Sequence, residues 1–470
     1  MGRRKKNHPF FEDLEIVDIA SNGLAVAKTE DKVIFVRDAI PGDRADIQVY
    51  KKRKGILEGR ATAIRSYSKE RQEPVCQHFG TCGGCKWQNM QYQAQLTFKQ
   101  ATVVNNLKKI GGIIPGTIHP ILPSPDNVLY RNKLEYTFSN KRWLTKEEIN
   151  ANADETMDTN GLGFHIPGRF DKVLDIEQCH LQADPSNAIR LSVKEFALKE
   201  GLSFFDIRKQ HGLLRNLIIR NTTLGEIMVL VSFYENDATA IENTMAHIKS
   251  QFPEVTSLLY VVNGKKNDTI FDLDIQTYHG KGHILEKLDC LQYQIGPKTF
   301  FQTNSAQATT LYKAALKLAD FKGDEMVYDL YSGSGTIACF IAGSVNKVIG
   351  LEYIPEAIED AKANAKMNNI DNASFFAGDI KDLLKEEFVN EQGRPQVIIT
   401  DPPRAGMHKE VVEQIMKIQP EKIVYISCNA ATQARDIALM TTNYHVKAIQ
   451  PVDMFPHTHH VENIALLVKN

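Results

Sequence analysis

The sequence predicts a multidomain protein whose C-terminal part is a parallel, doubly wound, Rossmann-like α/β sheet. From residue 300 onward, short β-branched strands alternate with helical segments, which is typical of strand–helix–strand units. Several of these strands end in glycine-rich or acidic turns, and in an open α/β sheet the carboxyl ends of the strands form the ligand-binding edge. A small N-terminal β-barrel and a central α+β domain are predicted to precede the sheet.

The composition is that of an ordinary soluble protein. Of its 470 residues, 43% are hydrophobic and 24% are charged, and the net charge is −1. No apolar run reaches the roughly 20 residues that a membrane span needs, and the basic N-terminus lacks the apolar core of a secretory signal. We therefore expect a cytoplasmic monomer with no membrane partner. In that reducing compartment the cysteines are expected to be metal-bound, catalytic or buried.

Residues 1–70 are predicted to form a basic tail and an RNA-binding β-barrel. Short alternating runs between residues 12 and 66 are separated by Asn-Gly, Pro-Gly-Asp and Lys-Gly turns. Closure into a barrel would protect the edges of such short strands. The tail Arg3–Lys6 and the loop Lys51–Lys54 carry positive charge suited to phosphates, although either alone also fits a solvated segment.

A group of cysteines marks the start of the central α+β domain, which is predicted over residues 71–290. Cys76, Cys82 and Cys85 lie within ten residues of one another, and the last two form a C-x2-C pair. A closed metal site requires a fourth thiolate, for which Cys179 is the candidate. Zinc and an iron–sulfur cluster both accept four thiolates, so the spacing leaves the metal open.

The C-terminal domain, predicted over residues 291–470, has strand ends suited to S-adenosylmethionine. A first strand runs into the glycine-rich turn Ser332–Gly335, and a second ends in Glu352, which can hydrogen-bond a ribose diol. A third strand ends in Gly378-Asp379, suited to the adenine rim, and a fourth ends in Asp401-Pro402-Pro403. A single acid at such a place is usually a helix cap or a surface group, but the ordered set predicts a methyl-donor fold.

A cysteine follows the next strand of this sheet. The apolar run Ile423–Ile426 leads into Ser427-Cys428-Asn429 and then into a helix, which places the Cys428 thiol at the same edge. A thiolate that adds to carbon 6 of uracil makes carbon 5 nucleophilic enough to accept a methyl group. The proton on carbon 5 must then leave, and we assign Glu462, just before the last strand, as the base. The thiol needs a lowered pKa or a nearby base, and the N-terminus of the following helix is expected to help.

The histidines His457, His459 and His460 are expected to position a carboxylate or contact RNA phosphate rather than bind a metal. The Asp-Pro-Pro strand end also suits methylation of an amino group, a rival chemistry that does not need Cys428.

These motifs resemble those of the RNA uracil-C5 methyltransferases. The resemblance rests on Asp401–Gly406, Ser427–Asn429 and Pro456–Glu462. With a barrel that resembles a TRAM domain and the cysteine cluster, it is strongest to the RumA type, which acts on 23S ribosomal RNA. The resemblance implies a 4Fe-4S cluster, a methyl donor, a nucleophile and a base. The implied residues are Cys76, Cys82, Cys85 and Cys179 for the cluster, Gln302, Tyr331, Thr336, Glu352, Asp379 and Asp401 for S-adenosylmethionine, Cys428 as nucleophile and Glu462 as base.

Two other functions remain open at this stage. The same chemistry could act on a T-loop uridine of tRNA. The chain could instead be an RNA-binding ribosome assembly factor with a vestigial donor site, although the intact Cys428 and Glu462 argue against that.

Overall fold

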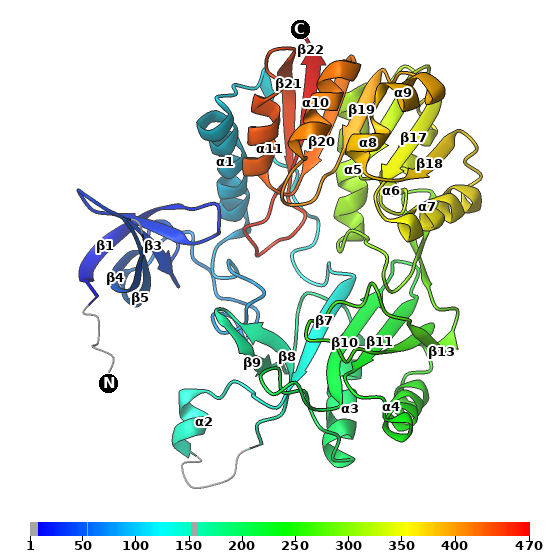
Figure 1. Cartoon of the computed structure of the whole chain (residues 1–470). Coiled ribbons are helices and arrows are strands. Elements are labelled where there is room, and N and C mark those ends of the chain that lie inside the picture. The colour runs from blue at the N-terminus through cyan, green and yellow to red at the C-terminus, as the bar shows by residue number, and fades with distance from the viewer. Residues whose placement is uncertain (1–7, 54, 152–157) are drawn as a thin grey trace.

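The computed structural model describes residues 8–53, 55–151 and 158–470 and has three parts (Figure 1). The predicted basic tail, Arg3–Lys6, and Lys54 of the predicted basic loop lie outside the described residues. A barrel lies beside two larger units, one built on the central sheet and one on the C-terminal sheet. Along the described residues, no helix combines the length and apolar composition that crossing a membrane requires.

The N-terminal strands close into a barrel, as predicted. They are β1 (Phe10–Ile19), β2 (Ala25–Lys28), β3 (Val33–Arg37), β4 (Arg44–Arg53) and β5 (Ile56–Ser66), in the order β1-β2-β3-β5-β4. Alternation along the strands sends Ile16, Ile34 and Ile47 into a small core in which all three are fully buried. Closure leaves no open edge for another chain to pair with.

The central part is a mixed sheet in the order β13-β12-β11-β10-β7-β8-β9. Its elements are α2 (Lys146–Ala151), β7 (Lys133–Ser139), β8 (Gly161–Ile166), β9 (Arg169–Asp175), α3 (Ser186–Lys199), β10 (Leu214–Asn221), β11 (Ile227–Phe233), α4 (Ala238–Gln251), β12 (Ser257–Val262) and β13 (Gln276–Gly280). The apolar faces of α3 and α4 share one core with the sheet, which buries Ile189, Met245 and Leu217. The predicted α+β architecture is therefore present.

The C-terminal part is a doubly wound sheet in the order β18-β17-β16-β19-β20-β22-β21-β6. Its elements are β14 (Ile284–Leu288), β15 (Leu291–Ile295), α5 (Ser305–Ala319), β16 (Met326–Leu330), α6 (Thr336–Ala342), β17 (Lys347–Glu352), α7 (Pro355–Met367), β18 (Ala373–Ala377), α8 (Ile380–Leu383), α9 (Glu386–Gln392), β19 (Val397–Thr400), α10 (Lys409–Ile418), β20 (Lys422–Ser427), α11 (Ala430–Ala438), β21 (Tyr444–Val452) and β22 (Glu462–Lys469). Strands β16 to β20 pair in parallel, whereas β22 is antiparallel to β20. Separate apolar cores cover the two faces, as the predicted fold class requires.

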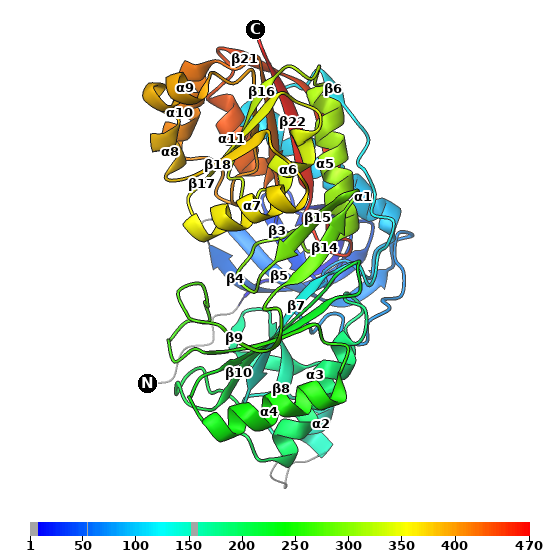
Figure 2. The ribbon, with the colours of Figure 1, turned by 90° about the vertical axis from the view of Figure 1, so that its right-hand side faces the viewer.

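Two elements of the segment predicted as the central domain pack against the C-terminal sheet. Helix α1 (Tyr92–Gly111) and strand β6 (Thr117–Ile118) lie inside the predicted 71–290 segment, yet they belong to the C-terminal sheet (Figures 1 and 2). Helix α1 packs beside α11, its Val103 and Leu107 share a core with that sheet, and β6 pairs with β21. An amphipathic pattern shows that a helix must cover an apolar surface, but it does not show which surface.

Candidate active site and cysteine cluster

The strand ends of the C-terminal sheet lie in one row. Leu330 of β16 pairs with Leu351 of β17 and with Thr400 of β19, and Thr400 pairs with Tyr425 of β20. The residues that follow these positions therefore leave the sheet at a common edge. Tyr331, Glu352, Asp401 and the end of β20 come together there, as the sequence predicts.

Cys428 and Glu462 meet at this edge from adjacent antiparallel strands. Ser427, the last residue of β20, pairs with Asn463 near the start of β22. Cys428 is the next residue beyond Ser427, and Glu462 is the residue before Asn463, so the two occupy facing positions. The thiol is half-buried, and Glu462 is only 4% exposed. The candidate nucleophile and base are thus neighbours across one strand pair.

The electrostatics of Cys428 differ from the expectation of a lowered pKa. Burial, together with the Glu462 and Asp401 carboxyl groups, raises the pKa of the Cys428 thiol to about 11, and Arg404 opposes this effect. The N-terminus of α11, which was expected to lower the pKa of Cys428, does not outweigh the effect of burial. The Asn429 side chain caps α11 by accepting a hydrogen bond from the Ala431 amide at 3.1 Å. The thiol is therefore protonated in the free protein at neutral pH.

The carboxyl groups beside the thiol also have raised pKa values. Burial raises the pKa of Glu462 well above its usual range, with a further contribution from Asp401 and an opposing one from Arg404. Burial raises the pKa of Asp401 to about 7. Buried groups with shifted pKa values gather at functional sites because proton transfer requires them. Arg404 favours the charged form of both Cys428 and Glu462.

The predicted donor residues surround a tight turn at the same edge. Glu352 accepts hydrogen bonds from the Gly333 amide and from the Ile354 amide, each at 3.0 Å, which fixes its carboxylate beside the turn. Tyr331 has a φ of +64°, a left-handed conformation that is uncommon for a residue with a side chain. At Gly335, a Cβ atom would lie 2.8 Å from Ala361 Cβ, so only glycine fits there.

The other predicted donor residues Asp379, Thr336 and Gln302 make different contacts. Asp379 caps α8 through the Lys381 amide at 3.2 Å and forms an ion pair with the Lys381 ammonium at 3.3 Å. Thr336 begins α6, and its hydroxyl lies 3.3 Å from the Ser334 hydroxyl. Gln302 precedes α5, and its carbonyl accepts a hydrogen bond from Asn132 Nδ2 at 2.9 Å.

The four candidate cysteine ligands line one cavity of about 410 Å³. Cys179 comes from the segment before α3, whereas Cys76, Cys82 and Cys85 come from the loop that follows the barrel. Burial raises the pKa of Cys82 to about 12 and that of Cys85 to about 11. Within the described residues, no three His, Cys, Asp or Glu side chains converge closely enough to hold a single metal ion. The cavity also reaches Thr458, four residues before Glu462.

Comparisons with known proteins agree with this geometry. Residues 222–470 match the family model described as tRNA (uracil-5-)-methyltransferase. The chain belongs to this family. Residues 12–62 match the model of the TRAM domain, which corresponds to the barrel. The predicted fold class and the predicted enzyme class, an S-adenosylmethionine-dependent RNA uracil methyltransferase, are confirmed.

Relatives of this methyltransferase span nearly its whole length. An uncharacterized RNA methyltransferase of Bacteroides thetaiotaomicron is 52% identical over 452 residues, which cover 96% of this chain and 99% of the relative. One from Chlorobaculum tepidum is 37% identical over 461 residues, covering 96% and 95%. The solved structure of Pyrococcus abyssi tRNA (uracil-54, C5)-methyltransferase in complex with S-adenosyl-L-homocysteine has a TM-score of 0.73 at 30% identity and covers 97% of this chain and 99% of that one.

Asp329 is a buried acid of this methyltransferase, beside the candidate site, that the sequence prediction did not single out. It lies in β16 and is 0% exposed, and neither carboxylate oxygen has a hydrogen-bond partner in the part of the chain that the structure describes. Burial, followed by the charge of Asp401, raises its pKa well above the usual range. The sequence did contain an indication of this residue, because an acid stands inside the apolar strand that leads into the glycine turn.

The barrel of the methyltransferase lies against the loop that precedes Glu462. Gly23, in the turn between β1 and β2, has a φ of +81°, and a Cβ atom there would lie 2.7 Å from His459 Cβ. Its carbonyl accepts a hydrogen bond from Trp87 Nε1 at 3.1 Å. The TRAM domain is therefore in direct contact with the loop that leads into Glu462.

Proposed function

We propose that this methyltransferase methylates carbon 5 of an RNA uridine through a covalent bond between Cys428 and carbon 6. The observation that carries the proposal is the facing placement of Cys428 and Glu462 at the strand edge that also bears the glycine turn. Amino-group methylation would use the Asp-Pro-Pro segment alone and gives no role to this pair.

The chemistry divides between the two residues. Cys428 first loses its thiol proton to solvent. The thiolate then adds to carbon 6, and the electron pair of the carbon 5–carbon 6 double bond moves into the uracil ring as an enolate. Bound S-adenosylmethionine supplies an electrophilic methyl group, which carbon 5 takes up. The Glu462 carboxylate then removes the proton from carbon 5. The released electron pair restores the double bond, and Cys428 leaves as a thiolate.

The donor would lie along the row of strand ends. Glu352, held by two amide hydrogen bonds, would accept from the ribose hydroxyl groups, and Asp379 would contact the adenine rim. Tyr331, Thr336, Gln302 and Asp401 complete the proposed contacts.

The reactivity of the Cys428 thiol should rise steeply with pH. Its pKa is raised to about 11, so each pH unit below that value changes the thiolate fraction about tenfold. We expect the rate of Cys428 alkylation by iodoacetamide, followed by peptide mass spectrometry, to rise about tenfold per unit between roughly pH 7 and 9. Arg404→Met should slow alkylation at every pH in this range, because Arg404 lowers the pKa. A plateau below about pH 8 would contradict the raised pKa.

The substrate proposed from the resemblance to the RumA type is 23S ribosomal RNA. A uridine of tRNA is the second candidate, favoured by the similarity to the Pyrococcus abyssi tRNA (uracil-54, C5)-methyltransferase. Either target must present a uracil that is single-stranded or flipped from its stack, since carbon 6 is otherwise covered. Mapping 5-methyluridine in ribosomal and transfer RNA from a deletion strain tests both, because the modified position that disappears identifies the substrate.

We further propose that Cys76, Cys82, Cys85 and Cys179 hold a 4Fe-4S cluster, with zinc as the alternative. The convergence of four thiols on one cavity supports a metal centre. A single zinc ion needs its ligands gathered at about 2.3 Å from one point, whereas a cubane binds each thiolate at a separate iron. When bound, the cluster would join the loop after the barrel to the central domain, and the methyl transfer itself does not require it.

The identity of the metal can be tested on the purified protein. We expect an anaerobic preparation to be brown, with broad absorption near ~400 nm that Cys179→Ser removes or strongly reduces. Cys290→Ser is the matched control, because Cys290 is exposed between β14 and β15 and should leave the spectrum unchanged. A colourless preparation with stoichiometric zinc would support the alternative.

A further inference from the structure

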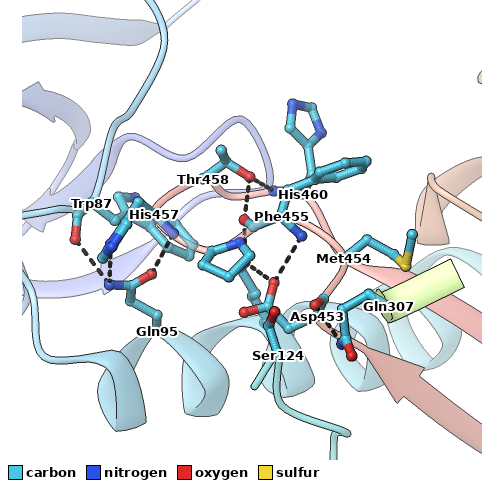
Figure 3. Close-up of polar contacts among 12 residues, drawn as sticks. Trp87, Gln95, Ser124, Gln307, Asp453, Met454, Phe455, His457, Thr458 and His460 are labelled. Carbon is cyan, nitrogen blue, oxygen red and sulfur yellow. Dashed lines mark hydrogen bonds and ion pairs between the residues drawn. The ribbon is translucent and has the colours of Figure 1, made fainter. Parts of the chain in front are cut away.

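The loop between β21 and β22, residues 453–461, leads directly into Glu462 and is held by donors from distant parts of the chain (Figure 3). Five consecutive backbone carbonyls of this loop accept hydrogen bonds from outside it. The Asp453 carbonyl accepts from the Gln307 side chain at 2.8 Å, and the Met454 carbonyl accepts from the Asn304 side chain at 3.0 Å. The Phe455 carbonyl accepts from Lys99 at 2.9 Å, and the Pro456 carbonyl accepts from the Tyr130 hydroxyl at 3.0 Å. The His457 carbonyl accepts from the backbone amides of Lys86 and Trp87 at 2.8 and 3.0 Å. The shape of the loop therefore depends on contacts with other elements in addition to hydrogen bonds within the loop, such as that from Thr458 Oγ1 to the Phe455 carbonyl.

One face of helix α1 provides the side chains that reach furthest into this loop. Tyr92, Gln95 and Lys99 are spaced three and four residues apart, which places them on the same side of the helix. Lys99 Nζ lies 2.5 Å from Asp453 Oδ1, and both side chains are 0% exposed. The Tyr92 hydroxyl donates to Asp453 Oδ2 at 2.8 Å. A buried ion pair with additional hydrogen bonds fixes geometry, because removing one partner leaves the other charge unpaired.

Gln95 fixes the middle of the loop (Figure 3). Its Oε1 accepts a hydrogen bond from the His457 amide at 2.9 Å, and its Nε2 lies 3.2 Å from His457 Nδ1. His457 has a φ of +64°, a conformation that external contacts must maintain. Burial lowers the pKa of His457 to about 4, so the ring is neutral and can accept from the Gln95 amide. The contacts of α1 thus hold the first half of the loop, from Asp453 to His457.

We propose that Tyr92, Gln95 and Lys99 are positioning residues that hold the Glu462 carboxylate in place for proton removal from carbon 5. The inference rests on the proposed role of Glu462 as the base. These side chains lie outside residues 222–470, the segment that matches the methyltransferase family model. They lie on helix α1, which was predicted to be part of the central domain but packs against the C-terminal sheet. In this protein, an element from the N-terminal half shapes the site of the last proton transfer.

The test uses the intact protein, S-adenosylmethionine and uridine-containing substrate RNA. A misplaced base leaves Cys428 attached to a uracil that already carries the methyl group, because the proton on carbon 5 cannot leave. We expect Lys99→Met to accumulate this methylated covalent complex on denaturing gels and to lower kcat by about ten- to a hundredfold, with little change in KM for S-adenosylmethionine. Lys141→Met is the matched control, since Lys141 pairs with the buried Asp206 in the central domain. It should not accumulate the complex.

Reference variants separate the possible outcomes. If Glu462→Gln accumulates the complex and a folded Lys99→Met does not, the positioning inference is wrong while the base assignment stands. If neither variant accumulates it, the proposed role of Glu462 fails as well. Should Lys99→Met not fold, Tyr92→Phe decides, because it removes one hydroxyl group from Asp453 and keeps the ring. A Tyr92→Phe enzyme with normal kcat and no complex would overturn the proposal.

Discussion

Replacing Cys428 with alanine is expected to lower methyl transfer to RNA by about 10⁴-fold or more. The thiol forms the bond to carbon 6 that activates carbon 5, and a methyl side chain cannot replace it. Transfer of a radiolabelled methyl group from S-adenosylmethionine to RNA measures the loss. Cys428 is half-buried at the edge of the sheet, so the alanine variant should fold normally.

RNA containing 5-fluorouridine gives a sharper form of this prediction. Fluorine cannot leave carbon 5 as a proton does, so a working thiolate remains trapped on carbon 6 after methyl transfer. The parent protein and the control variant Cys290→Ala should both form a denaturation-resistant complex, and Cys428→Ala should form none. If Cys428→Ala is trapped as efficiently as the parent, Cys428 is not the nucleophile.

The arrangement of the catalytic edge was predictable because its signals are local. A strand ending in Cys428, strands ending in Glu352 and Asp401, and a glycine turn each occupy a few adjacent residues. A general rule then places all strand ends of a parallel sheet at one edge. The antiparallel placement of the last strand, which brings Glu462 opposite Cys428, follows from pairing that the sequence pattern does not specify.

Other features were not predictable because they depend on contacts between distant residues. Lys99 and Asp453 are 354 positions apart, and neither stands in a recognisable motif. The pKa of Cys428 is raised, whereas the adjacent sequence predicted a lowered value. A helix N-terminus favours a thiolate, but burial and two neighbouring carboxyl groups outweigh it. The extent of burial in the folded protein determines the direction of this pKa shift, and burial cannot be derived from the residues adjacent to Cys428.

Replacing Glu462 with glutamine should lower turnover by about 10²- to 10⁴-fold. The amide has nearly the shape of the carboxyl group but cannot take the proton from carbon 5. Cys428 should still add to carbon 6 and the methyl group should still transfer. The variant is therefore expected to accumulate methylated RNA that is covalently bound to protein, detectable by mass spectrometry after a single turnover. Glu413→Gln, at an exposed position on α10, is the control and should turn over normally.

The same variant should make the thiol more reactive while it makes the enzyme slower. The Glu462 carboxyl group raises the pKa of Cys428, so glutamine should lower that pKa and speed alkylation of the thiol at a given pH. A disordered active site would slow turnover without producing the methylated complex. Faster alkylation together with an accumulated complex therefore indicates that Glu462 acts on both the thiol and the carbon 5 proton. Normal turnover with no complex would instead assign proton removal to another residue, and Asp401, whose pKa is raised to about 7 at the same edge, would be the next to test.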